Sequence, residues 1–162
     1  MNYPLIGQVL LLLIVANGAP ILARRLLRHR LYRPIDGGLI LADGQPLLGA
    51  SKTWRGLFAS LLLTAVMAWL LGLSFAFGLL FAALTMSGDL LTSFIKRRLG
   101  MQASSMALGF DYLLESLLPV AVLAVPLGLA LIEVIVIVLL FLVLALFLSR
   151  FLYWLGVRKQ PY

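Results

Sequence analysis

Apolar residues gather in five stretches along the chain, and polar segments separate these stretches. A helix that crosses the ~30 Å hydrocarbon core of a bilayer needs about 20 mainly apolar residues, and the five stretches approach or reach that length. The pattern therefore predicts an all-α integral membrane protein, a bundle of five transmembrane helices. The predicted spans cover residues 4–22, 57–71, 75–95, 110–127 and 129–148.

One interruption falls inside the first span, at the motif ANGAP, residues 16–20. Glycine and proline commonly interrupt helices, so a break is predicted there, between the apolar run 4–16 and the pair Ile21 and Leu22. Residues 1–3 carry no charged side chain. A secretory signal needs a basic segment at that place, so the span is interpreted as a retained first helix.

The composition narrows the class of protein further. Hydrophobic residues make up 63% of the chain and charged residues 12%, and the mean hydropathy is +1.10. These values are typical of an integral membrane protein with one domain, residues 1–162. The chain has no cysteine, which excludes disulfides and thiolate chemistry. His29 is the single histidine and a poor candidate for a metal ligand or a base, because arginines surround it.

The distribution of charge predicts the topology. All 13 lysines and arginines fall in residues 24–55, residues 96–98 and the tail from Arg150. With five spans these segments lie on one side, which the positive-inside rule assigns to the cytoplasm. The N-terminus is then outside, and the C-terminus is cytoplasmic. Residues 23–55 and 96–109 become the cytoplasmic polar loops that carry the site. Topology also explains the net charge of +7, so no nucleic-acid partner is expected.

The end of the third span combines a carboxylate, a hydroxyl and basic residues. Asp89, Ser93, Lys96 and Arg97 are spaced i, i+4, i+7 and i+8, so a helix places them on one face. An ionisable residue at the membrane surface is costly and indicates function. The alternative is an ordinary basic flank that anchors the helix, with Asp89 paired to Lys96 or Arg97.

Two more acids open the fourth span. Asp111 and Glu115 are spaced i, i+4 and face the same way. The helix dipole alone would explain one acid at this place, but two acids at the membrane level of Asp89 predict a cation site. Hard oxygen ligands suit Mg²⁺, with Mn²⁺ as a substitute, and Mg²⁺ commonly binds carboxylates together with substrate phosphates.

The loop before the second span adds an anion site. Glycines beside Asp36 and Asp43 predict turns, and Lys52, Thr53 and Arg55 stand where the second helix begins. Free amide groups, glycines and cations at a helix N-terminus bind phosphate readily. Acids and cations on one cytoplasmic face, at the depth of lipid head groups, indicate phosphoryl or nucleotidyl transfer to a lipid.

Four motifs carry a resemblance to a known family. The motifs are ANGAP (16–20), PIDGG (34–38), DGQPLLGASKTWRG (43–56) and GDLLTSFIKRRLG (88–100). Over about residues 16–119 the chain resembles the CDP-archaeol synthase family, small five-helix relatives of the phosphatidate cytidylyltransferases. Tyr112 replaces a common Gln, and Glu115 lies at i+4 where the archaeal pattern has Asp at i+3. The Lys-Asp and His-Gly-Gly elements of the larger enzymes are missing. These departures leave the lipid acceptor open.

The resemblance implies a CTP-dependent cytidylyltransferase that converts a lipid phosphate in the bilayer to a CDP-lipid and releases pyrophosphate. The implied metal ligands are Asp89, Asp111 and Glu115. The implied catalytic residues are Lys52, Arg55, Asp89, Lys96 and Arg97, and the implied nucleotide-binding residues are Lys52, Thr53, Ser93, Lys96 and Arg97. Asn17, Asp36 and Asp43 are secondary candidates, and a homo-oligomer is allowed.

Two other functions stay open at this point. A non-enzymatic protein, such as a cation carrier or an assembly factor, would use the same acids but would not need Lys52 or Lys96. Another lipid-phosphate enzyme is the second alternative, but the spaced Asp motif of the CDP-alcohol phosphotransferases is absent. Glu133, the only charge within the fifth span, is interpreted as structural or interfacial.

Overall fold

The computed structural model describes residues 1–28, 30–101, 109–154 and 156. Every predicted apolar stretch is helical there, so the all-α class is confirmed. His29, the part of the predicted loop that holds Ser104 and Ser105, and the basic pair Arg158 and Lys159 lie outside the described residues. The helices are α1 (Tyr3–Leu27), α2 (Trp54–Leu70), α3 (Phe75–Arg98), α4 (Phe110–Val122), α5 (Ala124–Leu127) and α6 (Leu131–Trp154).

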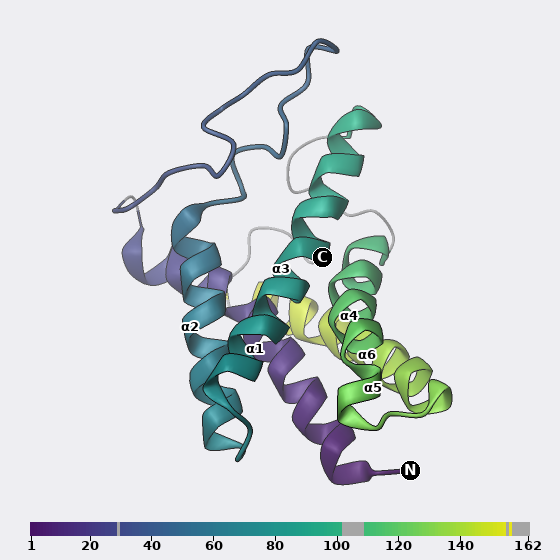
Figure 1. The fold of residues 1–162 in the computed structure, drawn as a ribbon. Coiled ribbons are helices and arrows are strands. Elements are labelled where there is room, and N and C mark those ends of the chain that lie inside the picture. Colours follow the sequence, from purple (N-terminus) through teal and green to yellow (C-terminus); the bar gives the residue numbers. More distant parts are fainter. Residues whose placement is uncertain (29, 102–108, 155, 157–162) are drawn as a thin grey trace.

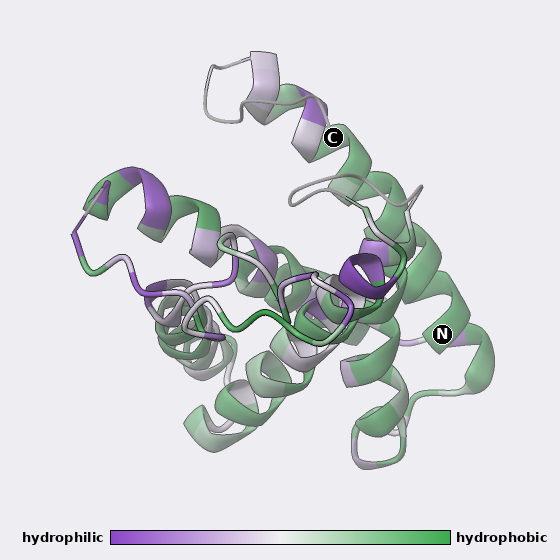
Figure 2. Cartoon of the chain, turned by 90° about the horizontal axis from the view of Figure 1, so that it is seen from above, coloured by the Kyte–Doolittle hydropathy of each residue, from purple (hydrophilic) through white to green (hydrophobic). Residues whose placement is uncertain are grey.

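The helices form one bundle whose two ends differ in polarity. Helix α1 packs against α2, α3 and α6, and α4 packs against α3 and α6. The segment 28–53 and the C-terminal end of α3 lie at one end of the bundle, and the N-terminus and α5 lie at the other (Figure 1). Seen from above, hydrophilic residues gather in loops and helix ends while the helix bodies are hydrophobic (Figure 2). We call the end with segment 28–53 the polar end.

Three of the described helices can each cross a membrane by length and composition. They are α1, α3 and the part of α6 from Leu131 to Phe151. Helix α2 has 17 residues and α4 has 13, both below the ~20 residues of a full span. A membrane protein is therefore supported, and five complete spans remain a prediction.

The break predicted inside the first span is wrong, because α1 continues through Pro20. A proline inside a helix leaves the carbonyl four residues earlier without its usual amide donor. That carbonyl belongs to Ala16, and the hydroxyl of Ser60 on α2 donates a hydrogen bond to it at 2.8 Å. Both residues are fully buried. A side chain of the neighbouring helix thus replaces the missing amide and lets the helix continue.

Two glycines bring α3 into direct backbone contact with its neighbours. A Cβ atom on Gly78 would lie 2.5 Å from Cα of Ala65 on α2. A Cβ atom on Gly88 would lie 2.5 Å from the carbonyl oxygen of Leu114 on α4. Small residues allow such close packing of membrane helices. The contact at Gly88 places the next residue, Asp89, against the start of α4.

The helices extend further into the polar end than the sequence pattern predicts. Residues 23–27 belong to α1, so the polar segment begins only after Leu27. Residues 96–98 form the last turn of α3 and are not part of a loop. Their positive charges complement the carbonyl end of the helix dipole. The basic residues of α3 are consequently held on a rigid element.

Candidate active site

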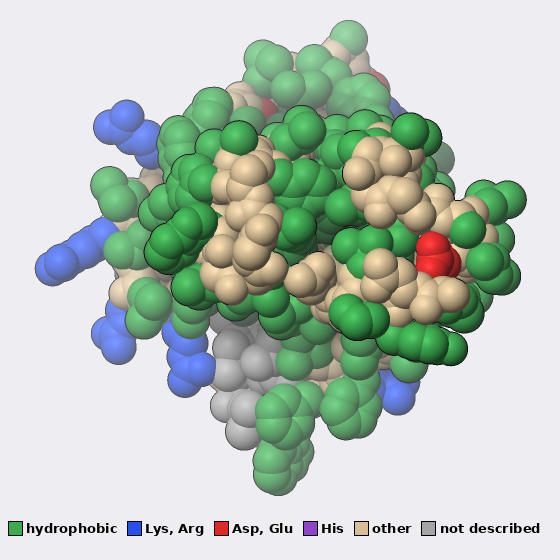
Figure 3. Space-filling model, turned by 60° about the horizontal axis from the view of Figure 1, so that its bottom comes forward, with side chains coloured by type: hydrophobic (Ala, Val, Ile, Leu, Met, Phe, Trp, Pro, Cys, Tyr) green, Lys and Arg blue, Asp and Glu red, His purple; other side chains and the backbone are tan. Residues whose placement is uncertain are grey.

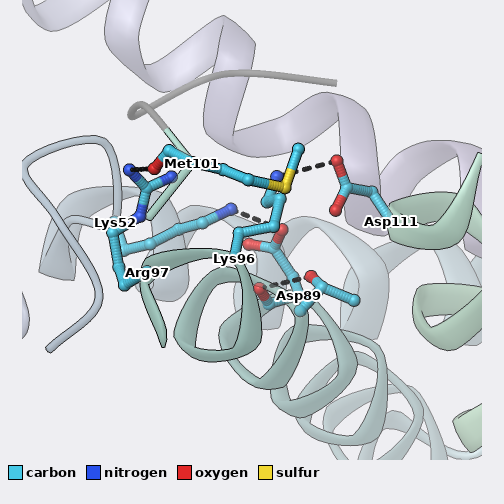
Figure 4. A network of polar contacts seen from close by, with 7 residues as sticks. Lys52, Asp89, Lys96, Arg97, Met101 and Asp111 are labelled. Atoms are coloured by element: carbon cyan, nitrogen blue, oxygen red, sulfur yellow. Dashed lines mark hydrogen bonds and ion pairs between the residues drawn. The ribbon is translucent and has the colours of Figure 1, made fainter. Parts of the chain in front are cut away.

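Two lysine–aspartate pairs join three segments at the polar end. Lys52, from segment 28–53, forms an ion pair with Asp89 on α3. Lys96 on α3 pairs with Asp111 on α4, with 2.8 Å between Nζ and Oδ2. Figure 4 shows the two pairs next to each other, with the lysine side chains pointing into the space between the helices. We call these four residues the paired-charge cluster.

Glu115 extends the cluster into the bundle. It is a buried residue of α4, one helical turn beyond Asp111, and its side chain lies close to that of Asp89. The close approach at Gly88 makes this contact possible, since a Cβ atom there would lie only 3.0 Å from Cα of Glu115. Asp89 and Glu115 are therefore neighbours across the contact between α3 and α4, and Asp111 pairs separately with Lys96.

The loop holds Lys52 in a defined position. Its carbonyl oxygen accepts a hydrogen bond from the amide of Ile35 at 2.9 Å, and Thr53 forms an antiparallel bridge with Pro34. Burial alone would lower the pKa of Lys52, but the carboxylates of Asp89 and Glu115 outweigh it and raise the pKa above its ordinary value. Lys52 therefore remains a cation at neutral pH.

Arg98, the last residue of α3, anchors the far part of the loop. Its guanidinium pairs with Asp43 at 2.7 Å, donates to the carbonyl of Pro46 at 2.6 Å and lies over the ring of Phe94. One side chain thus combines an ion pair, a backbone hydrogen bond and a cation–π contact. We infer that Arg98 fixes segment 28–53 on α3. No local sequence pattern indicates this role of Arg98, because Asp43 lies 55 positions away.

Asp36 stabilises the loop from within. Its carboxylate accepts hydrogen bonds from the amides of Leu48 at 2.9 Å, Gly49 at 2.8 Å and Gly38 at 3.0 Å. Slight burial would raise the pKa of Asp36, but these bonds lower it below its ordinary value. Asp36, a secondary site candidate, therefore acts in the folding of the loop, as Asp43 does through Arg98.

Arg55 and Thr53 also have structural contacts. Arg55 donates to the carbonyls of Arg28 at 2.6 Å and Arg30 at 2.9 Å, and it lies over the ring of Tyr32. The hydroxyl of Thr53 accepts a hydrogen bond from the amide of Gly56 at 3.4 Å and so caps the N-terminus of α2. These contacts fix both ends of segment 28–53 to α2.

The residues predicted to share one face of a helix all lie on α3, and most of them are buried. Ser93, Lys96 and Arg97 are buried, and the side chain of Asp89 is 18% exposed. The ion pair of Asp89 is with Lys52, however, and not with Lys96 or Arg97, as the anchoring alternative expects. The guanidinium of Arg97 donates to the carbonyl of Met101, which closes the end of α3 (Figure 4).

A pocket of about 320 Å³ opens beside the cluster, where α1, α2 and α3 meet segment 28–53. Its lining has a polar part and an apolar part. The polar part includes Arg24, Ser51, Lys52, Thr53, Arg55 and Asp89. The apolar part includes Pro20, Ile35, Leu57, Met86 and Leu90. Arg24 is a lining residue that the sequence analysis did not single out; its i+4 spacing from Pro20 is the signal that places both on one face of α1.

The predicted three-acid metal site is not assembled in the part of the chain that the structure describes. No three acidic or histidine side chains of those residues are grouped so that they could hold a metal ion. Asp111 pairs with Lys96, and Asp89 with Lys52. One oxygen of Asp111, Oδ1, is buried and accepts no hydrogen bond from the described residues. A carboxylate oxygen without a partner among the described residues is a hard ligand of the kind that suits Mg²⁺, with substrate phosphates as further ligands.

Asn17 lies away from the cluster. Its amide donates to the carbonyl of Leu13 at 3.0 Å, and it lines a small cavity of about 40 Å³ between α1, α4 and α6. The structure therefore does not bring this secondary candidate together with the other site residues.

The fold and the cluster define an all-helical membrane protein with a charged site at one end of the bundle. The chain belongs to the CarS-like family, described as CDP-archaeol synthase, whose model matches residues 31–162.

Named relatives agree with this family. The chain is 41% identical over 108 residues to the CDP-archaeol synthase of Hyperthermus butylicus, which covers 62% of this chain and 60% of that protein. It is 41% identical over 105 residues to the enzyme of Pyrobaculum arsenaticum, which covers 61% of this chain and 62% of that protein. These matches therefore span less than two thirds of the relatives' own length.

A solved structure shares the fold. It is described as an intramembrane enzyme for archaeal membrane lipids biosynthesis, and its TM-score with this chain is 0.70 at 29% identity. The match covers 86% of this chain and 89% of that chain. The similarity in fold thus extends over most of both proteins.

Proposed function

We propose that the protein is a membrane cytidylyltransferase that uses CTP and a lipid phosphate to make a CDP-lipid and pyrophosphate. One observation supports this most strongly: the paired-charge cluster beside the pocket, in a chain of the CarS-like family. Its ammonium groups suit phosphates and its carboxylates suit a divalent cation. A substrate phosphate could replace the carboxylates as the partner of the lysines, and its cation could replace the lysines as the partner of the carboxylates.

The reaction needs positioned charge and no general base. An ionised oxygen of the lipid phosphate attacks the α-phosphorus of CTP, the bond from that phosphorus to the bridging oxygen breaks, and pyrophosphate leaves with the electron pair. Lys52 and Arg55 line the pocket, and Lys96 and Arg97 lie buried on the adjoining face of α3. These cations would bind and orient the phosphates and stabilise the charge that develops on them.

The acids would hold the cation that accompanies CTP. Bound Mg²⁺ would neutralise charge on the attacking and leaving oxygens. Asp89, Asp111 and Glu115 are the residues that would hold it. When phosphates bind Lys52 and Lys96, these lysines no longer need their carboxylate partners, so oxygens of Asp89 and Asp111 become available. Thr53 and Ser93 would contribute hydroxyl groups, one from the N-terminus of α2 and one from the interior face of α3.

The polar end would face the cytoplasm, where nucleoside triphosphates are found. Segment 28–53 and the last turn of α3 lie at this end (Figure 1). Both contain several basic residues, as the positive-inside rule requires of a cytoplasmic side. A reporter inserted in the turn at residues 72–74, at the opposite end, should be found outside. A cytoplasmic reporter there would reverse the orientation.

The test of the reaction is a turnover assay. Purified protein is incubated with labelled CTP, Mg²⁺ and a panel of lipid phosphates, and CDP-lipid and pyrophosphate are measured with and without a chelator. Lys52→Ala and Lys96→Ala should each lower turnover more than tenfold, which corresponds to ~1.4 kcal/mol of transition-state stabilisation. Cation flux without CTP turnover would support the non-enzymatic alternative and overturn the proposal.

A further inference from the structure

We infer that the pocket between α1, α2, α3 and segment 28–53 binds the lipid phosphate, and that Arg24 is the ligand of its phosphate group. This inference rests on the proposed function, because it divides the two substrates of that reaction between two parts of one site. The lipid phosphate would occupy the pocket, and the nucleotide would bind at Lys96 and Asp111 of the paired-charge cluster.

Arg24 differs from the other cations of the pocket in its contacts. Lys52 pairs with Asp89, and Arg55 donates to backbone carbonyls of the loop. The side chain of Arg24 forms no hydrogen bond or ion pair with the residues that the structure describes, and it is exposed where it lines the pocket. An uncompensated guanidinium presents a planar set of donors that matches phosphate oxygens. It can bind an anion without breaking an existing contact.

The pocket has the amphipathic lining that a lipid phosphate requires. Leu57, Met86 and Leu90 contribute apolar lining from α2 and α3, and the loop contributes polar lining. Carbon atoms next to the phosphate of a lipid would pack on this apolar lining, whereas a ribose would leave its hydroxyl groups without partners there. A volume of about 320 Å³ is at the small end of ligand sites, as expected for a head group whose chains continue into the bilayer.

The pocket also adjoins the paired-charge cluster, where the proposed reaction takes place. Lys52 and Asp89 belong both to the pocket lining and to the paired-charge cluster. A phosphate bound by Arg24 and Lys52 would therefore lie near Asp89, the partner of Lys52. Lys96 and Asp111 do not line the pocket, so they remain available for the triphosphate. This arrangement brings the attacking oxygen and the α-phosphorus together at Asp89.

The test compares two neighbouring arginines. Arg25 is also exposed but does not line the pocket, so Arg25→Gln is the matched control for Arg24→Gln. We expect Arg24→Gln to raise the KM for lipid phosphate at least tenfold while the KM for CTP stays within twofold. Arg24→Lys should recover part of the loss, because it restores the charge without the planar donor set. Arg25→Gln should leave both KM values unchanged.

A binding measurement without CTP separates this inference from the proposed function. A long-chain lipid phosphate should raise the melting temperature of the wild-type protein and of Arg25→Gln, but not that of Arg24→Gln; inorganic phosphate should raise none. Equal effects of both substitutions, or a raised KM for CTP alone, would overturn the inference. Lipid binding that depends on Arg24 in a protein without CTP turnover would uphold the inference and overturn the proposed reaction.

Discussion

The two ends of the bundle use carboxylates in different ways. At the polar end Asp89 and Asp111 pair with lysine side chains. At the opposite end Glu133 accepts hydrogen bonds from the backbone amides of Asn2 at 2.7 Å and Ala130 at 3.0 Å. Hydrophobic side chains cover most of that end, where one acidic patch is visible (Figure 3). Glu133 therefore ties the chain start to α6, which agrees with a structural role.

The contrast separates charges that can change partners from charges that cannot. A lysine can leave a carboxylate when a phosphate arrives, because it gains another anion. A backbone amide at the start of a helix has no such alternative, and its acceptor stabilises the fold only. Substitutions at the polar end should therefore change turnover most, and substitutions at the opposite end should change stability alone.

The largest effect is expected for Asp89→Asn, which keeps the shape of the side chain and removes its charge. We expect CDP-lipid formation per folded protein to fall by roughly 10²-fold or more, the scale of ~3 kcal/mol for one preorganised electrostatic contact. If the acids hold one metal ion together, as proposed, adding Asp111→Asn should cost little more. Additive small losses would argue against a shared site and reduce both acids to a structural role.

A smaller effect is expected for Arg98→Ala, which releases segment 28–53 from the end of α3. Lys52 would then be held less firmly over Asp89, and we expect a roughly tenfold loss of kcat/KM, or ~1.4 kcal/mol. Limited proteolysis should cleave the loop faster. Asp43→Ala removes the exposed ion pair and the acceptor of the Gln45 amide, but it leaves the bond from Arg98 to Pro46, so it should have a weaker effect, within ~1 kcal/mol. Arg98→Lys should cause a loss of kcat/KM between the losses caused by Arg98→Ala and Asp43→Ala. An unchanged rate of proteolysis in all three variants would refute the anchoring role.

At the opposite end, Glu133→Ala should leave turnover per folded molecule unchanged. The amides of Asn2 and Ala130 lose their acceptor, so the melting temperature should fall by a few degrees. Thermal unfolding in detergent and a parallel turnover assay measure the two quantities. A loss of turnover without a loss of stability would contradict the division between the two ends.

The smallest effect concerns pH and the loop itself. The pKa of Asp36 is lower in the folded loop than in the unfolded chain, so the folded loop binds fewer protons. Its contribution to stability is present above the unfolded pKa of about 3.9 and is lost as the pH falls through the folded value. Hydrogen exchange at the amides of Leu48 and Gly49 should become faster as the pH falls through the folded pKa of Asp36. Asp36→Asn should remove this pH dependence, and an identical profile in both proteins would show that another group controls it.

The helices and the interior face of α3 could be predicted from the sequence. Apolar runs identify helices in a membrane, because backbone groups there must be satisfied within the segment. The i, i+4 spacing from Asp89 to Ser93 and the basic pair that follows predicted that these residues share one face of a helix, and Ser93, Lys96 and Arg97 are buried in the structure. Local periodicity determines these features, so neighbouring residues are enough to reveal them.

The choice of partners could not be predicted, because it depends on how the helices pack. Lys52 reaches Asp89 across 37 positions, and no local pattern links them. The contact between Asp89 and Glu115 follows from the close approach at Gly88, whose role appears only when α4 lies beside it. The continuity of α1 was missed for the same reason, since the donor that compensates for Pro20 comes from α2.

The hydrogen bond from Ser60 to Ala16 also restricts how the molecule can move. If α1 slid past α2 by one helical turn, 5.4 Å, that carbonyl would lose its donor in a setting without water. Gly56 on α2 adds a steric limit at the same level, since a Cβ atom there would lie 3.2 Å from Cβ of Pro20 on α1. The two helices should therefore move as one body. Of the elements that line the pocket, α1 and α2 are thus held to each other, whereas segment 28–53 is held to α3 through Arg98.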